Sequence, residues 1–102
     1  DGLTAKPAKT TITGISNKTA GKLVISWKKS KGAKGYEIYR RAGTTNSYVK
    51  AAVIQSGSTI RYTNMKLKKG HTYYYRIRSY TYDKNGEKVY SGWSTVKSQK
   101  VK

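Results

Sequence analysis

The amino-acid sequence predicts an all-β fold, a seven-stranded antiparallel β-sandwich. Apolar and polar residues alternate with a period of two in several short segments, which indicates strands that bury one face and expose the other. Glycine and asparagine residues separate these segments at a spacing that is typical of sandwiches and barrels. No segment of useful length shows the periodicity of an amphipathic helix.

The chain length of 102 residues predicts a single domain. A chain of this size buries roughly 60–68% of its unfolded surface on folding, which is enough for a hydrophobic core. Residues 1–8 contain the only proline and no periodicity, so we predict a linker there and a domain over residues 9–102. No apolar run approaches the ~20 residues that span a bilayer, so we expect no membrane insertion.

The first three predicted strands are defined by β-branched residues and by alternation. Segment 10–15 is short and rich in threonine and isoleucine, which favour strands. Segment 22–28 alternates, with leucine, isoleucine and tryptophan on one face. Segment 34–41 places Tyr36 and Ile38 together on one face, which we therefore expect to be buried.

The later strands follow the same rule. Segment 47–54 has a weaker pattern, whereas segment 58–64 brings an isoleucine and Tyr62 to one face. Segment 72–82 is the longest and the richest in tyrosine, and segment 88–101 completes the chain. These segments and the first three make up the seven predicted strands.

The Asn-Gly dipeptide at 85–86 lies between two alternating runs and predicts a β-hairpin. A type I′ turn needs a positive φ at both central residues, which this dipeptide tolerates well. Such a turn would place Lys84 opposite Glu87 and Asp83 opposite Lys88. Both would be cross-strand pairs of opposite charge, which stabilise a hairpin.

Two landmarks in this pattern resemble those of fibronectin type III domains, which have an immunoglobulin-like sandwich. The first is Trp27 at the end of KLVISWKK, which resembles the core tryptophan of the family's second strand. The second is LKKGHTYYYRIRS, residues 67–79, where Tyr73 falls on the position of the "tyrosine corner", whose hydroxyl returns to the backbone upstream. The absence of cysteine disfavours a true immunoglobulin domain with a disulfide between its sheets.

The alternation and the resemblance together divide the side chains between the core and the outer face of one sheet. The predicted core residues are Trp27, Tyr36, Ile38, Tyr62, Leu67, Tyr73, Tyr75 and Ile77. The residues predicted to point outward from the same sheet are Glu37, Tyr39, Arg41, Tyr74, Arg76, Arg78, Tyr80 and Tyr82. The outer face would therefore mix tyrosine and arginine.

This mixed face has two interpretations. Cross-strand pairs that each contribute roughly 0.2–1 kcal/mol, with cation–π contacts of about 0.5–1 kcal/mol, would explain it by stability alone. Alternatively, exposed tyrosines would stack on sugar rings or bases while arginines bind phosphate or carboxylate groups. The candidate binding residues are Tyr39, Tyr74, Arg76, Arg78 and Tyr80. For Trp93 two positions remain: it covers an edge or end of a sheet, or it is exposed near a junction between domains.

The charge of the chain is its most unusual property. Twenty-two Lys and Arg residues against four Asp and Glu residues give a net charge of +18, whereas small domains have a magnitude of about 2–8. Such a field attracts polyanions in a salt-sensitive manner. Lysines on edge strands also prevent edge-to-edge pairing. The charge could therefore serve only to keep the protein soluble and to prevent aggregation.

The sequence gives no sign of catalysis. Asp83 and Glu87 flank the predicted turn, and His71 lies at a corner before a strand, so no acid–base pair converges. Without cysteine there is no disulfide and no thiolate metal site, and no glycine-rich phosphate loop occurs. We therefore expect neither an enzyme nor a cofactor nor a bound metal.

The lysine-rich composition and the N-terminal segment AKPAKTTITGI resemble those of the fibronectin type III modules of bacterial surface and secreted proteins. In such proteins the modules lie in series as spacers or beside catalytic and glycan-binding domains. The resemblance implies a monomeric, non-catalytic extracellular module, a spacer or adhesion module, whose partners are neighbouring domains and anionic cell-wall polymer or polysaccharide. Two alternatives use the Tyr/Arg face, namely a sequence-indifferent nucleic-acid binder and a carbohydrate-binding module.

Overall fold

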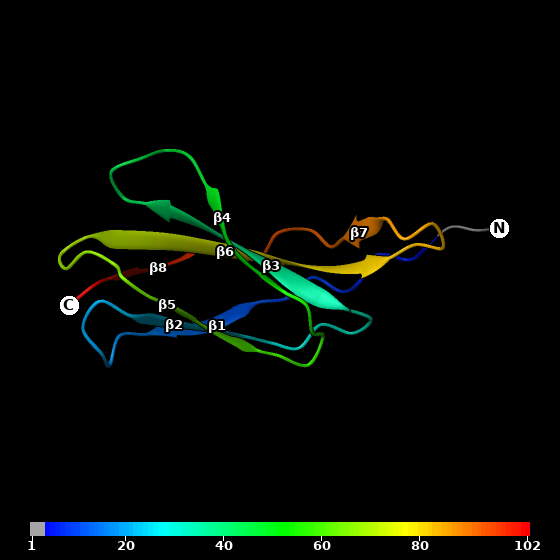
Figure 1. Ribbon diagram of the computed structural model, residues 1–102, viewed down its shortest axis with the longest axis horizontal. Helices are drawn as coiled ribbons and strands as arrows, with labels where there is room; N and C mark the ends of the chain where they lie inside the picture. Colours follow the sequence, from blue (N-terminus) through cyan, green and yellow to red (C-terminus); the bar gives the residue numbers. More distant parts are fainter. Residues whose placement is uncertain (1–3) are drawn as a thin grey trace.

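The computed structural model describes residues 4–102 and shows two layers of antiparallel strands with no helix between them (Figure 1). The all-β prediction is therefore confirmed. The strands are β1 (Ile12–Ser16), β2 (Leu23–Trp27), β3 (Gly35–Ala42), β4 (Val49–Ile54), β5 (Arg61–Asn64), β6 (Thr72–Tyr82), β7 (Lys88–Tyr90) and β8 (Lys97–Lys100). None of the described residues forms a helix that is long and apolar enough to cross a membrane.

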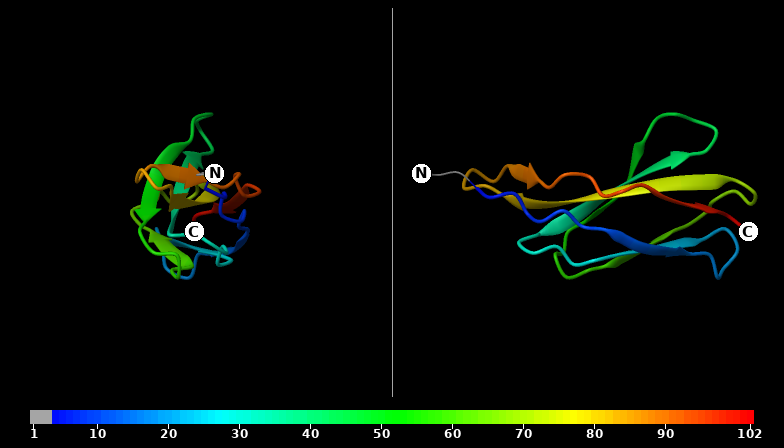
Figure 2. Two further views of the ribbon diagram at one scale, coloured as in Figure 1. Left: turned by 90° about the vertical axis from the view of Figure 1, so that its right-hand side faces the viewer. Right: turned by 180° about the vertical axis from the view of Figure 1, so that it is seen from behind.

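The two layers contain different numbers of strands. One sheet has the order β1-β2-β5, and the other has the order β4-β3-β6-β7, with β8 paired to β6 as well. Figure 2 shows the same arrangement along the long axis of the domain and from behind. The structure has eight strands rather than seven because the last predicted strand is split into β7 and β8, which pair with opposite ends of β6.

Two serine side chains hold the segment between β7 and β8 against the middle of β6. The hydroxyl oxygens of Ser91 and Ser94 accept hydrogen bonds of 2.9 and 3.0 Å from the backbone N–H groups of Ser79 and Ile77, respectively. The backbone N–H groups of the same two serines donate to the carbonyls of Ser79 and Ile77 at 2.9 Å. The segment thus stays hydrogen-bonded to β6 without forming a regular strand. It places Trp93 beside the outward arginines of β6.

The hydrophobic core lies between the two sheets. Trp27 is only 1% exposed, and the centroid of its ring lies 5.4 Å from that of Tyr36. The structure also buries Ile38, Leu67, Tyr73, Tyr75 and Ile77 in this core. Tyr62 is partly buried and packs against the core from β5.

The tyrosine at the corner before β6 makes the expected bond to the backbone. The hydroxyl of Tyr73 accepts a hydrogen bond of 3.1 Å from the backbone N–H of Lys68. This contact ties the loop after β5 to the start of β6, as the resemblance predicts.

A polar network links the two sheets next to this corner. The Oδ1 atom of Asn64 on β5 accepts hydrogen bonds from the Tyr75 hydroxyl at 2.6 Å and from Arg40 Nη1 at 3.0 Å. Arg40 therefore faces the interior side of β3 rather than the solvent. Burial, partly opposed by the charge of Arg40, raises the pKa of Tyr75 far above its ordinary value.

The turn between β6 and β7 differs from the predicted type I′ turn. The N–H of Gly86 donates to the carbonyl of Asp83, and the N–H of Asp83 donates to the carbonyl of Glu87. Gly86 has a φ of 81°, whereas Asn85 has no positive φ. The loop thus has three residues and ends in a left-handed glycine, and the Asp83 carboxylate stabilises it by accepting the N–H groups of Asn85 and Glu87.

The longer loop changes the cross-strand pairs, so both predicted charge pairs are wrong for the described residues. Lys88 lies opposite Tyr82, and its ammonium group binds Glu37 on β3. Lys84 lies inside the loop, where it has no cross-strand partner.

Part of the predicted linker packs against the sandwich. Residues 1–3 lie outside the described residues, but Pro7 is buried and the N–H of Ala8 donates to the carbonyl of Lys31. The carbonyl of Ala8 accepts a hydrogen bond of 2.9 Å from the hydroxyl of Ser79. The chain is therefore anchored two residues before the predicted start of the domain.

The domain is elongated, with principal extents of 51 × 26 × 19 Å. The blue start of the described chain and its red end lie at opposite ends of the long axis (Figures 1 and 2). Strands β1, β2, β6 and β8 run roughly along this axis, whereas β3 and β4 are inclined to it (Figure 1).

Candidate functional site

The candidate site is the outer face of the five-stranded sheet. Along β6 the side chains alternate as predicted, with Tyr73, Tyr75 and Ile77 buried and the residues between them partly exposed. Strand β3 lies beside β6, and its outward residues face those of β6 in register. The facing pairs are Glu37 with Arg78, Tyr39 with Arg76, and Arg41 with Tyr74.

Five side chains on this face form an alternating stack of rings and guanidinium groups, here called the ladder. The Cζ atom of Arg76 lies 4.3 Å from the ring centre of Tyr48 and 4.1 Å from that of Trp93. The Cζ atom of Arg78 lies 4.6 Å from the ring centre of Trp93 and 3.6 Å from that of Tyr90. Each such contact contributes roughly 0.5–1 kcal/mol at the surface and more where water is excluded.

Neighbouring side chains contact the ladder at its Tyr48 end and at Trp93 in its centre. Arg41 lies 4.0 Å from the ring centre of Tyr74 and 5.8 Å from that of Tyr48. Tyr39 meets Trp93 edge-on, with ring centroids 5.0 Å apart. The aromatic rings on this face are thus largely occupied by contacts within the protein.

Glu37 lies on the same face but is completely buried, because three side chains cover its carboxylate. Arg78 donates to Oε1 through Nε at 3.1 Å and Nη2 at 2.9 Å. Lys88 Nζ and the Tyr90 hydroxyl donate to Oε2 at 2.9 and 3.2 Å. Burial of the carboxylate acts to raise its pKa, but the hydrogen bonds and charges of Lys88 and Arg78 outweigh it and hold the pKa of Glu37 below its ordinary value.

The expected exposure of Tyr80 is wrong, because its side chain is only 1% exposed. Gly35 lies opposite Tyr80 on β3 and leaves a space that the tyrosine ring fills. The hydroxyl lies 3.4 Å from the carbonyl oxygen of Ile54, and Lys88 and Tyr82 cover the ring. Tyr80 is therefore a packed residue that offers no ring face to a ligand.

We expect Gly35→Ala to lower the free energy of unfolding by about 1–3 kcal/mol, because overpacking costs about this much. A Cβ at this position would lie 2.3 Å from the carbonyl oxygen of Ile54 and 2.4 Å from the Tyr80 hydroxyl. Chemical denaturation monitored by circular dichroism would measure the change. Gly92→Ala is the matched control, since nothing lies within 4 Å of a Cβ there. Equal stability of the two variants would show that Tyr80 does not occupy this space.

The arrangement of the strands is similar to that of several solved structures. The sixth fibronectin type III domain of human fibronectin type III domain containing protein 3 is similar, with a TM-score of 0.72 and 14% identity over 97% of this chain and 89% of that chain. An Fn3-like protein from Clostridium thermocellum has a TM-score of 0.63 and 23% identity over 96% of this chain and 94% of that chain. The chain has the fibronectin type III fold. Neither a protein-family model nor a curated protein matches it.

A third similar structure contains several domains of this fibronectin type III fold. It comprises the FN1–FN3 domains of chicken CNTN1 and has a TM-score of 0.69 and 15% identity. The match covers 91% of this chain and 30% of that chain. The present domain thus corresponds in size to about one unit of that series.

The fibronectin type III fold supplies the strands, but the ladder depends on residues that the alternation did not identify. Tyr48 lies just before β4, and Trp93 lies in the irregular segment after β7. Tyr90 and Trp93 are three residues apart, which does not fit a period of two. The available signal was the pair of aromatic residues beside Ser91 and Ser94 in this last segment, which follows a strand with two outward arginines.

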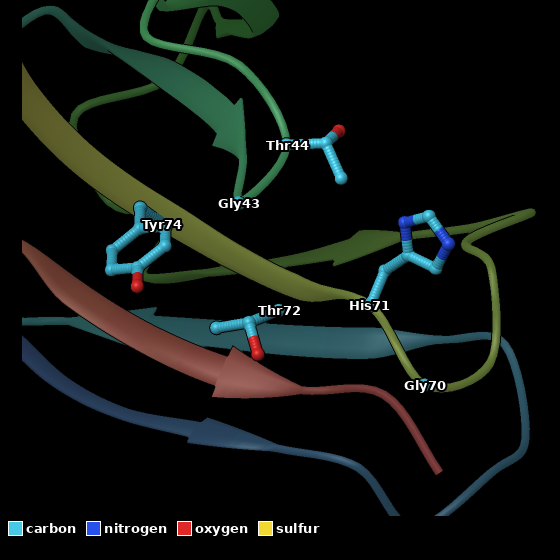
Figure 3. A pocket seen from close by; sticks show the side chains of 6 residues that line it. All are labelled: Gly43, Thr44, Gly70, His71, Thr72 and Tyr74. Atoms are coloured by element: carbon cyan, nitrogen blue, oxygen red, sulfur yellow. The ribbon is translucent and has the colours of Figure 1, made fainter.

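A shallow pocket of about 350 Å³ lies beyond the Tyr74 end of the face (Figure 3). Its lining residues are Gly43, Thr44, Gly70, His71, Thr72 and Tyr74. Figure 3 shows that the side chains of His71 and Tyr74 point in different directions. Within residues 4–102, no three histidine, aspartate or glutamate side chains lie together in a way that could hold a metal ion.

Proposed function

We propose that this domain is a non-catalytic accessory module, a spacer or adhesion module, of a larger bacterial surface or secreted protein. The observation that carries the proposal is the elongated fibronectin type III fold, whose chain ends lie at opposite ends of a 51 Å axis. Domains of this fold are generally extracellular accessory or linker modules. The Clostridium thermocellum structure supports a bacterial setting.

The charge supports the adhesion part of this proposal. Among residues 4–102, the only ion pairs are those of Glu37 with Arg78 and with Lys88. Nearly all of the 22 Lys and Arg residues therefore have no ion-pair partner within this described part of the chain. Their field would keep the module close to anionic cell-wall polymers or acidic glycans.

The alternative ligands receive less support from the outer face. Single-stranded nucleic acid and neutral glycans are held largely by stacking on open aromatic rings. Tyr80 is buried, and guanidinium groups lie against the rings of Tyr48, Tyr90 and Trp93. Few ring faces are thus left for bases or sugars. Binding of nucleic acid or neutral carbohydrate is therefore less well supported than the accessory-module function.

A direct test of the spacer function is to join two copies in series and to measure their maximum dimension by small-angle X-ray scattering. We expect a value close to twice the 51 Å long axis of one domain. Two copies joined by a long glycine-serine linker serve as the control, since such a linker allows them to fold back. A directly joined pair as compact as this control would contradict the spacer function.

A further inference from the structure

We infer that Arg76 binds the oxyanion groups of an acidic polysaccharide, with Arg41 as a second contact. This inference rests on the proposed contact with anionic polymers and assigns a site to it. The site lies on the outer face of the five-stranded sheet, at the Tyr48 end of the ladder.

The two arginines of the ladder differ in their counterions. Arg78 has an internal counterion, since its guanidinium donates twice to the carboxylate of Glu37. Within residues 4–102, Arg76 forms neither a hydrogen bond nor an ion pair through its side chain, and its Nε atom is buried without a partner. A partly dehydrated guanidinium without a counterion is less stable than a paired one, so an anion from a partner would relieve part of this cost.

The Arg76 guanidinium is held in a fixed position with its outer donors free. The rings of Tyr48 and Trp93 lie 4.3 and 4.1 Å away, and Nε is buried. Arg76 is nevertheless partly exposed, so its Nη groups are the donors that reach solvent. The planar pair of Nη groups matches the two oxygens of a carboxylate or phosphate. The stacked rings also fix the guanidinium before binding, which lowers the entropy lost in the complex.

Other positive charges surround Arg76. The Cζ atom of Arg41 lies 5.8 Å from the ring centre of Tyr48, which Arg76 also contacts, and the exposed Lys50 on β4 lies opposite Tyr39. The carboxylate closest in register belongs to Glu37, which is already bound by Arg78 and Lys88. Several cations with unused charge thus lie together, and a polymer with regularly repeated anionic groups would contact them at the same time.

A polysaccharide fits these observations better than a nucleic acid does. Single-stranded nucleic acid gains much of its affinity from base stacking, at about 1–3 kcal/mol per base. The rings of Tyr48 and Trp93 are each in contact with a guanidinium group, and Tyr80 is buried. A ligand that supplies carboxylate groups without bases needs no free ring.

The test measures binding of polygalacturonate to the intact chain at physiological salt, with single-stranded DNA, polyphosphate and neutral dextran as comparison polymers. Arg76→Gln should weaken binding of polygalacturonate roughly 10-fold or more, because a charge-assisted hydrogen bond contributes about this much. Lys18→Gln removes the same charge at an exposed position between β1 and β2, and we expect a change of about twofold or less. Arg76→Lys keeps the charge but loses the planar donor pair, so it should bind less well than the natural chain.

The fluorescence of Trp93, which contacts Arg76, offers a second readout. Addition of polygalacturonate should change this emission in the natural chain and not in Arg76→Gln. Equal weakening by Arg76→Gln and Lys18→Gln would overturn the site in favour of a diffuse field. Tighter Arg76-dependent binding of DNA or polyphosphate would overturn the choice of polysaccharide, and absence of binding would overturn the site altogether. The scattering test of the spacer does not involve Arg76, so the two proposals can fail separately.

Discussion

Replacement of Trp27 by alanine is expected to lower the free energy of unfolding by about 3–5 kcal/mol, the range for loss of a large buried aromatic side chain. Trp27 is 1% exposed and packs against Tyr36 in the centre of the core. Its Nε1 atom has no hydrogen-bond partner among the described residues, so the loss arises from packing alone. Domains of this size have a total stability of about 5–15 kcal/mol, so much of it would disappear.

Urea denaturation monitored by circular dichroism would measure this loss. Trp27→Phe is the matched control, since it retains an aromatic ring and should cost clearly less than the alanine variant. A nearly unchanged midpoint for Trp27→Ala would mean that this ring does not lie in the core and that the register of β2 is wrong.

Glu37→Gln is expected to lower the free energy of unfolding by about 3 kcal/mol, the lower end of the range for breaking a buried ion pair. The carboxylate is fully buried, and the neutral amide would leave Arg78 and Lys88 beside each other without a counter-charge. The lower end applies because these two side chains remain 22% and 28% exposed. Glu87→Gln at the exposed hairpin is the matched control and should have little effect.

The same carboxylate predicts how stability depends on pH. Its pKa in the folded protein lies below the ordinary value of 4.5, so the unfolded chain binds the proton more readily. The contribution of Glu37 is therefore fully present above the ordinary pKa and is lost as the pH falls through the lowered folded pKa. Unfolding of the natural chain and of Glu37→Gln, measured across this acidic range, should show the stability difference shrinking. A difference that stays constant would contradict the assignment.

The alternation in the sequence was sufficient to separate the two faces of β6. It placed Tyr75 and Ile77 inside and Arg76 and Arg78 outside, because side chains on a strand must alternate. It failed for Tyr80 because burial there depends on Gly35 of the neighbouring strand, and the cross-strand register is not contained in either segment alone.

The ladder could not be predicted from the sequence for a related reason. Period-two reasoning assigns directions only within regular strands, whereas Tyr48 and Trp93 lie outside them. The position of Trp93 depends on Ser91 and Ser94, whose hydroxyls replace regular strand pairing along β6. A serine hydroxyl can replace strand pairing in this way only where the neighbouring strand has the right register, and this register is known only from the folded structure.

The placement of the chain ends has a mechanical consequence. Tension applied through the two ends would act along the strands, because the ends lie at opposite poles of the long axis (Figure 1). The hydrogen bonds between β6 and β8 would then be sheared together instead of being opened one after another. A domain loaded in this way resists extension more strongly than one that is unzipped from an edge, a property that would suit the proposed spacer.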